Sequence, residues 1–173
     1  MSTIPCRCGD TALELTGGPI MTATCHCTSC RTAGAELAAL PGAVPVADAH
    51  GGTPYVMWRK DRVTVLRGAG HLREHRLSPK GSRRVVAVCC NSPLYLNFPG
   101  GHWLSLYAAR FDAPPPPELR TMLMDVDGPL PDDGVPGAKR QTARFMGKLL
   151  LSWAATGFRR FPLEPMLPLE VTR

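Results

Sequence analysis

The stretch Thr24-Cys25-His26-Cys27-Thr28-Ser29-Cys30-Arg31 places three of the chain's seven cysteines within six positions. The other cysteines form two further groups, Cys6-Arg7-Cys8 followed by Gly9, and the adjacent pair Cys89-Cys90. A lone CxC or CxxC pair can occur by chance, and a free buried cysteine is a common core residue. Cysteines gathered at ligand spacing in separate clusters instead indicate metal binding.

The number of cysteines suggests how they are divided between metal ions. Zinc binds thiolates in a tetrahedral arrangement, and two ligands one or two residues apart can hold one ion from a tight turn. Structural zinc sites use four protein ligands, whereas catalytic sites use three and keep one position for water or substrate. Seven cysteines therefore divide into four and three, and we predict two zinc ions per chain. The predicted open site is Cys25, Cys27 and Cys30.

The length of the chain and its number of cysteines limit the class of protein that it can be. A chain of 173 residues fits one domain that buries roughly two-thirds of its unfolded surface, so it does not need disulfides to fold. An odd number of cysteines also argues against a fully paired secreted scaffold. The first residues lack a basic start and an apolar core, and no apolar run reaches about 18 residues. We therefore expect a cytoplasmic protein without a membrane span.

The positive charge is local. The formal net charge is +6, and most of it comes from residues 59–84, where nine basic side chains face only Asp61 and Glu74. These nine are Arg59, Lys60, Arg62, Arg67, Arg73, Arg76, Lys80, Arg83 and Arg84. We interpret them as a solvated strand face, the alternative being a clamp for an anion such as the carboxylates of glutathione. His71 and His75 are interpreted as surface residues. Nucleic acid ranks last as a partner, because few aromatic side chains apart from Trp58 alternate with these charges.

The apolar pattern predicts a mainly β protein. Between residues 4 and 110 the chain shows short apolar runs broken by Gly, Pro and polar turns, with no long stretch of helical period. The predicted strands are 11–15, 21–25, 55–58, 62–66, 72–77, 83–88, 94–98 and 103–111. A redox role for the Cys27-Thr28-Ser29-Cys30 motif would require a βαβ unit, and the sequence shows none.

The C-terminal part changes to helical period. Pro-rich breaks at 114–117 and 129–137 precede a predicted amphipathic helix over 138–156, with Gly157 as its stop. Its apolar stripe is Thr142, Met146, Leu149, Leu150 and Trp153, which we expect to cover the β half. The predicted organisation is a zinc-binding β domain over 1–112, a Pro/Gly-rich connection over 113–137, and a helix and tail over 138–173 packing on the same domain. The fold class is α+β overall with β predominant.

The order of these motifs resembles a known family. CxCG, then CHCxxCR, then a cysteine before Ser92-Pro93-Leu94 is similar to the glutathione-dependent formaldehyde-activating enzyme (Gfa-like) superfamily, which includes the centromere protein V domain. The resemblance covers about residues 4–98, and the C-terminal helix lies outside it. It implies a small zinc-binding β-sheet fold of the β-tent type. It also implies a structural zinc at Cys6, Cys8 and the late cysteine pair, and a second zinc at the CHCxxC cysteines.

The late motif departs from the family pattern. Where the family has CxxCGSP, this chain has Ala87 at the first cysteine and Asn91 at the glycine, so Cys89 must substitute as the fourth ligand beside Cys90. Adjacent residues on an extended strand point to opposite faces, so both can hold one ion only if the chain turns there. Otherwise Cys89 is a buried free thiol. Asn91 would favour such a turn, because asparagine tolerates the left-handed conformation.

The resemblance implies carbon–sulfur lyase chemistry. A thiol bound to an open zinc is deprotonated, and its addition to an aldehyde gives a hemithioacetal, as proposed for glutathione and formaldehyde in this family. His26 could supply a proton, although an extended segment would point its side chain away from Cys25 and Cys27, so we read it as a surface histidine or one beside the ligands. The alternative function is a non-catalytic, zinc-stabilised binding module. The thiol, the aldehyde and the oligomeric state do not follow from the sequence.

Overall fold

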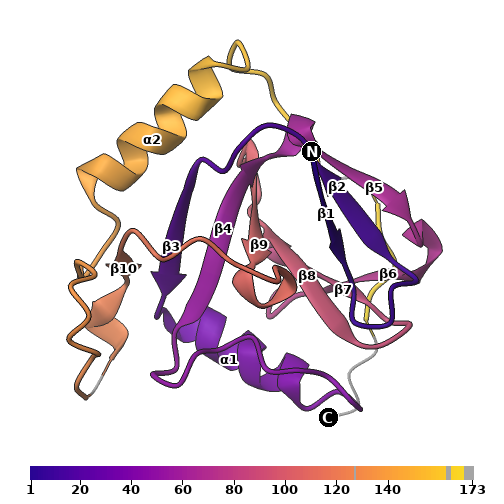
Figure 1. Cartoon of the computed structure of the whole chain (residues 1–173), viewed down its shortest axis with the longest axis horizontal. Helices are drawn as coiled ribbons and strands as arrows, with labels where there is room; N and C mark the ends of the chain where they lie inside the picture. Colours follow the sequence, from indigo (N-terminus) through magenta and orange to yellow (C-terminus); the bar gives the residue numbers. More distant parts are fainter. Residues whose placement is uncertain (127, 163–164, 170–173) are drawn as a thin grey trace.

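The chain forms two β-sheets and two α-helices in the computed structural model, which describes residues 1–126, 128–162 and 165–169 (Figure 1). The smaller sheet has the strand order β1-β2-β5, and the larger has the order β10-β3-β4-β9-β8-β7-β6. The pairings between the named strands are antiparallel except that of β10 with β3. The strands are β1 (Ser2–Pro5), β2 (Ala12–Leu15), β3 (Met21–Cys25), β4 (Thr53–Arg59), β5 (Val63–Arg67), β6 (Leu72–His75), β7 (Arg83–Ala87), β8 (Ser92–Asn97), β9 (Trp103–Tyr107) and β10 (Arg120–Thr121).

The main core lies between the two sheets. Ile4 of β1 and Leu13 of β2 face Val56, Val85 and Leu106 of the larger sheet, and all five side chains are buried. Each such side chain contributes roughly 1.5–3 kcal/mol through burial of its apolar surface. Because successive strand residues point to opposite faces, the neighbours of these core residues in β4 and β9 lie on the far face of the larger sheet.

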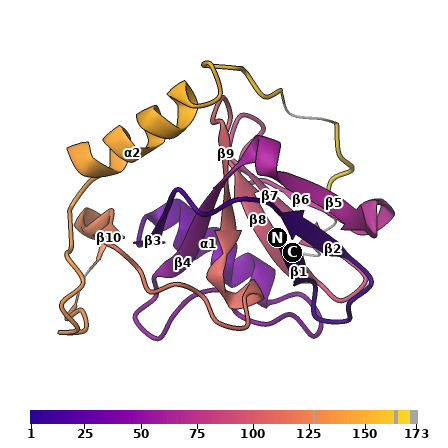
Figure 2. The same cartoon turned by 45° about the horizontal axis from the view of Figure 1, so that its top comes forward.

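Both helices cover that far face, at opposite ends. Helix α1 (Thr28–Ala38) follows β3, and helix α2 (Ala143–Ala154) follows the connection after β10. Cys30 of α1 packs with Tyr55 and Tyr107 of the sheet, whereas Phe145 and Leu149 of α2 pack near the β3 side. Figure 2 shows the separation of the two helices after rotation. A space on the sheet face therefore remains between them.

The predicted mainly β, α+β fold class is confirmed. Each of the eight predicted strands corresponds to an observed one within a few residues, except that 103–111 is strand only to Tyr107 and then continues as a 3-10 turn, Ala108–Arg110. The proposed boundaries at 112 and 137 stay a prediction. Residue 127 of the connection and residues 163–164 and 170–173 of the tail lie outside the described residues.

Helix α1 is missing from the sequence prediction. Its buried residues are Cys30, Ala33, Gly34 and Leu37, which follow the i, i+3, i+4, i+7 spacing of an amphipathic helix. Three of these four are cysteine, alanine or glycine, so the helical period is carried by small side chains rather than by large apolar ones. The prediction of no helical stretch before residue 110 was therefore wrong.

Helix α2 is shorter than predicted. It begins at Ala143 instead of 138, because Thr142 accepts a hydrogen bond from the Phe145 amide at 3.1 Å as its N-cap. Ala138 pairs instead with Arg120, donating its amide to the Arg120 carbonyl at 2.9 Å. The predicted stop is confirmed, since Gly157 has a φ of +65° just beyond the helix.

The buried stripe of α2 also differs from the prediction. Leu149 is buried as expected, but its partner is Phe145, whereas Met146 and Leu150 are 53 % and 56 % exposed. An ion pair between Lys148 and Glu118 holds the helix near the β3 side of the sheet. Because the helix covers only this side, only a narrow part of its apolar stripe is buried. Among the described residues, no helix has the length and apolar character needed to cross a membrane.

Candidate functional site

Four cysteines meet where the smaller sheet approaches the β7–β8 turn. Cys6 directly follows β1 and Cys8 lies in the next turn, while Cys89 and Cys90 lie between β7 and β8. The Cys6 and Cys8 sulfurs are 3.4 Å apart, and the Cys89 sulfur lies 3.7 Å from the first and 3.4 Å from the second. All four sulfurs lie within 4.8 Å of one another. The structure thus brings together the four residues predicted for the structural site.

The chain turns at the late cysteine pair, which the sequence left open. Residues 88–91 form the turn, and Asn91 adopts a left-handed φ of 50°, as expected for this position. The Cys90 sulfur lies 3.0 Å from the Ser92 hydroxyl. Because of this turn, Cys89 and Cys90 point into one cluster with Cys6 and Cys8.

The four-cysteine cluster has the dimensions of a zinc site. A tetrahedron of sulfurs at about 2.3 Å from zinc places each pair of sulfurs about 3.8 Å apart, close to the distances found here. The distances are far too long for disulfides, and all seven cysteines are free thiols. The Thr11 amide donates to the Cys6 sulfur at 3.3 Å, a contact that favours a thiolate. The cluster could hold a metal ion that ties the two sheets together.

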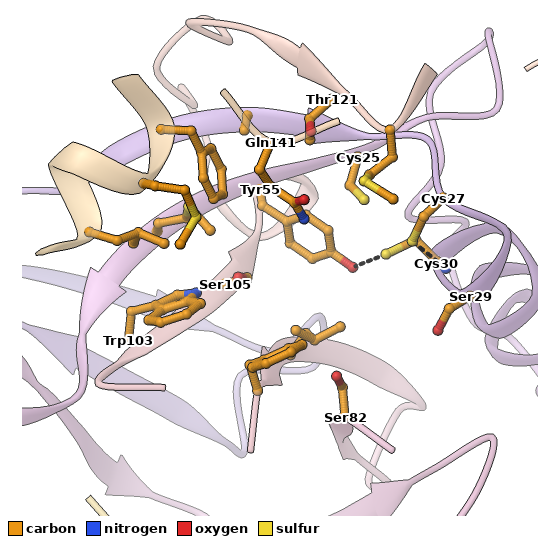
Figure 3. Close-up of a pocket in the computed structure, with 18 of the residues that line it drawn as sticks. Cys25, Cys27, Ser29, Cys30, Tyr55, Ser82, Trp103, Ser105, Thr121 and Gln141 are labelled. Atoms are coloured by element: carbon orange, nitrogen blue, oxygen red, sulfur yellow. Dashed lines mark hydrogen bonds between the residues drawn. The ribbon is translucent and has the colours of Figure 1, made fainter. Parts of the chain in front are cut away.

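The three remaining cysteines meet at the end of β3. Cys25 is the last residue of the strand, Cys27 is the N-cap of α1, and Cys30 lies in its first turn. Their sulfurs lie within 4.8 Å of one another, and the Cys30 amide donates to the Cys27 sulfur at 3.4 Å. Figure 3 shows the three sulfurs gathered at one end of a pocket. The predicted open-site residues are therefore also brought together.

The environment of these sulfurs favours negative charge on one of them, Cys27. Hydrogen bonds from Cys25 and Cys30 lower the pKa of Cys27 far below its usual value, and the nearby charge of Arg84 acts in the same direction. Hydrogen bonding to Cys27 raises the pKa of Cys25. All three thiols can therefore ionise together only if a cation shares the site. The cluster has the donor set to hold a soft divalent metal ion.

Tyr55 adds a hydrogen bond to this cluster. Its hydroxyl oxygen lies 3.6 Å from the Cys30 sulfur (Figure 3). Burial raises the pKa of Tyr55 well above its usual value, so the hydroxyl stays protonated. It can therefore donate a hydrogen bond to a thiolate. Such a contact from outside the ligand set stabilises a metal-bound sulfur.

Arg84 is the charged side chain beside the three cysteines, and only 2 % of it is exposed. Its guanidinium donates to the Ser29 carbonyl at 3.0 Å and to the Ser29 hydroxyl at 2.9 Å. Among the described residues, no carboxylate forms an ion pair with it. A buried cation requires a counter-charge, and three thiolates around a divalent ion leave one negative charge. Arg84 therefore fits an anionic metal–thiolate cluster.

The interpretation of residues 59–84 as a solvated face was wrong for its last two basic residues. Arg83 and Arg84 are both buried, and Arg83 pairs with Glu74 across β6 and β7. Two other basic residues are also held in ion pairs, Arg59 with Asp61 and Arg76 with Glu74. Four of the nine basic side chains of this stretch are thus held within the fold by burial or by ion pairs.

A pocket of about 450 Å³ opens from the three cysteines across the sheet face toward α2. Its cysteine end includes Arg84, Tyr55 and Thr121, and the uncharged polar side chains of Ser105 and Gln141 also line the pocket. Thr121 in β10 lies beside Cys25 in the parallel β10–β3 pairing and is 4 % exposed. Its hydroxyl has no hydrogen-bond partner among the described residues. No local pattern in the sequence marks this hydroxyl, because β10 reaches the site from almost a hundred residues along the chain.

Of the three histidines considered in the sequence, two are buried, His26 and His75, and one is exposed, His71. His26 is fully buried, and it shares a face with Thr24, since both side chains lie against the position that a β-carbon on Gly52 would occupy. It therefore points away from Cys25 and Cys27, as expected, and does not line the pocket. His75 is also buried, with its Nε2 2.7 Å from a Glu36 carboxylate oxygen of α1.

His71 is exposed, as predicted, but it has neighbours that the sequence did not suggest. It lies with Asp10 and Cys89 in a group whose ligand atoms are within 4.8 Å of one another. Because Cys89 already belongs to the four-cysteine cluster, this group lies at the side of that cluster.

The CxxC motif does not sit in a thioredoxin-like unit. The motif begins α1, but β3 and β4 on either side of the helix pair antiparallel. A βαβ unit requires parallel strands. The three sulfurs in one cluster also differ from a simple dithiol pair, so the geometry favours metal binding over a redox role.

The fold and its cysteines define a β-rich protein with two clusters that could each hold a metal ion, one of four thiols and one of three that opens onto a pocket. The model of a family of unknown function (DUF6151) matches residues 1–156, and the chain belongs to this family. The matched range includes α2. No curated protein matches the chain. Among solved structures it is similar to a crystal structure of a Rhodobacter sphaeroides protein, with 18 % identity, a TM-score of 0.47, and coverage of 66 % of this chain and 92 % of that chain.

Proposed function

We propose that the chain binds two zinc ions and uses the second as an open site for thiol–aldehyde chemistry, as a carbon–sulfur lyase of the Gfa-like kind. The observation that carries this proposal is the opening of the three-cysteine cluster onto the pocket. In the same proposal, the cluster of Cys6, Cys8, Cys89 and Cys90 is the structural zinc site. A reducing, cytoplasmic location would keep all seven thiols available.

The difference between the clusters supports the division of roles. Four sulfurs complete a tetrahedral zinc site, whereas three leave one position for an exogenous ligand. Within the described part of the chain, no fourth His, Cys, Asp or Glu joins Cys25, Cys27 and Cys30. A zinc ion bound there would accept a substrate thiol and keep it as a thiolate near neutral pH.

The chain's own residues support the addition step. Arg84 offsets the negative charge of the sulfurs, and the pocket holds the aldehyde carbon near the substrate sulfur. When the C–S bond forms, the carbonyl double bond becomes a single bond and its oxygen takes a proton from water. Thr121 lines the pocket, and its hydroxyl has no hydrogen-bond partner among the described residues, so it is our candidate to hydrogen-bond that oxygen. The reverse reaction breaks the C–S bond and gives the lyase direction.

The resemblance adds independent support. The CHCxxC motif begins a helix directly after a strand, and the early CxC and late cysteine pair converge despite the shift from Ala87 to Cys89. The order of motifs in the sequence and their grouping in space therefore agree.

The test is thiol binding to cobalt-substituted protein. Cobalt(II) reports its ligands in its absorption spectrum, so a thiol that enters the open site should change the visible bands and add sulfur-to-metal charge-transfer absorption. We expect this change with at least one of 2-mercaptoethanol, phenylmethanethiol and glutathione. The Cys27→Ser variant, which lacks one of the three sulfurs, should lose the response.

A spectrum that stays unchanged at saturating concentrations of all three thiols would contradict the proposal. If such a protein still bound two metal ions, both would be structural. The chain would then be a non-catalytic, zinc-stabilised binding module.

A further inference from the structure

We propose that the thiol accepted by this site carries an apolar body, aromatic or aliphatic, rather than the charged peptide of glutathione. This inference rests on the proposed function and concerns the chemical class of its substrate. The juxtaposition that carries it is a cluster of three sulfurs at one end of a pocket whose lining beyond them is mostly apolar, with Ser105 and Gln141 as uncharged polar exceptions.

The far end of the pocket is built from large apolar side chains of the sheet and of α2. These are Met57, Phe98, Trp103, Phe145 and Leu149. Phe98 and Trp103 stack with ring centroids 6.0 Å apart and an interplanar angle of 10°, so they offer flat aromatic surface. A volume of about 450 Å³ lies in the range of pockets that enclose small organic ligands.

The charges of the pocket do not suit glutathione. Glutathione carries two carboxylates and an ammonium group, and each would need a partner of opposite charge to leave water without penalty. Arg84 is the one charged side chain among the described residues that line the pocket, and it lies at the cysteine end. There it donates to Ser29 and offsets the charge of the sulfurs. Beyond the cysteine end, the described lining residues offer no charged partner to a distant carboxylate.

The polar groups of the pocket instead suit a small polar centre next to the sulfur. Thr121 and Tyr55 both lie at the cysteine end, where the hydroxyl of a thiol–aldehyde adduct would be. The preferred ligand is therefore polar near its sulfur and apolar beyond it. Burial of a phenyl ring would then add affinity through the hydrophobic effect.

Helix α2 provides a matched pair of positions for a test. Met146 lines the pocket yet is 53 % exposed, so a polar residue there need not disturb the core. Leu151 on the same helix is 73 % exposed and does not line the pocket. The variants Met146→Glu and Leu151→Glu therefore change charge and helix composition alike, but only the first alters the pocket.

The experiment measures dissociation constants of three thiols for the cobalt-loaded protein from the spectral change. We expect phenylmethanethiol to bind between about tenfold and a hundredfold more tightly than 2-mercaptoethanol. Glutathione should bind no more tightly than 2-mercaptoethanol. Met146→Glu should weaken phenylmethanethiol by roughly fivefold or more and leave 2-mercaptoethanol unchanged, whereas Leu151→Glu should change neither.

Two kinds of failure are distinguishable. Glutathione binding more tightly than phenylmethanethiol, or equal effects of the two glutamate variants, would overturn the substrate class while leaving the open site intact. An absence of any spectral response to all three thiols would overturn the proposed function itself. Circular dichroism and the metal content of each variant verify that it folds and is loaded.

Discussion

Replacing Cys6 with serine is expected to remove one zinc ion per chain and to lower the melting temperature by about 10–20 °C. Cys6 is buried and its sulfur lies within 3.7 Å of two other cysteine sulfurs in the structural cluster. Because the cluster joins the end of β1 to the β7–β8 turn, its metal would bind only in the folded state, and the binding free energy would contribute to folding. The expected destabilisation is on the order of 5 kcal/mol or more. Scanning calorimetry with metal analysis measures both effects.

The matched control for Cys6→Ser is Cys27→Ser. It should also remove one zinc ion, but the melting temperature should fall much less, because the three-cysteine cluster joins only β3 and the adjoining α1. Equal losses of stability in the two variants would contradict the assignment of one structural and one open site. A Cys6→Ser variant that keeps both zinc ions would contradict the structural site directly.

Replacing Arg84 with methionine is the second large expected effect. Methionine retains much of the length of the side chain but removes its charge, so the anionic metal–thiolate cluster would lose its buried counter-charge. Residues that act on metal ligands from outside the ligand set typically alter metal affinity by about 10–100-fold. We expect zinc affinity at the three-cysteine site to fall by that amount, while the four-cysteine site keeps its metal. Competition with a chromophoric chelator, which resolves the two sites by affinity, is the measurement.

Arg84→Lys controls for charge. It keeps the cation but not the guanidinium, whose Nη2 donates to both oxygen atoms of Ser29, so we expect a smaller loss of affinity than in Arg84→Met. Unchanged zinc affinity in Arg84→Met would show that the buried guanidinium serves only the packing of the sheet. That result would contradict the role of Arg84 as the counter-charge of an anionic open site.

Much of the strand content could be predicted because its signal is local. Short apolar runs separated by turn residues located β2 to β9, since alternation and turn chemistry are visible within a few residues. Helix α1 was missed because Cys30, Ala33 and Gly34 make up most of its buried face, and such small side chains give only a weak apolar period. The start of α2 was misplaced because Ala138 pairs with Arg120, a contact between distant parts of the chain.

The candidate site was predicted in its ligands but not in its surroundings. Cysteine spacing alone indicated the two clusters, because metal geometry limits how far apart ligands can lie along a turn. Whether Cys89 joined the first cluster depended on the conformation at Asn91, which only the structure decides. Arg84 and Thr121 reach the open site through the pairing of distant strands. Long-range pairing of this kind leaves no local pattern.

The most direct test of two metal sites is the number of zinc ions per chain, measured by native mass spectrometry on protein purified under reducing conditions. We expect two zinc ions in the unaltered chain, and one in each of Cys6→Ser and Cys27→Ser. One zinc ion in the unaltered chain, lost in Cys6→Ser and kept in Cys27→Ser, would contradict the open site and leave only the structural one.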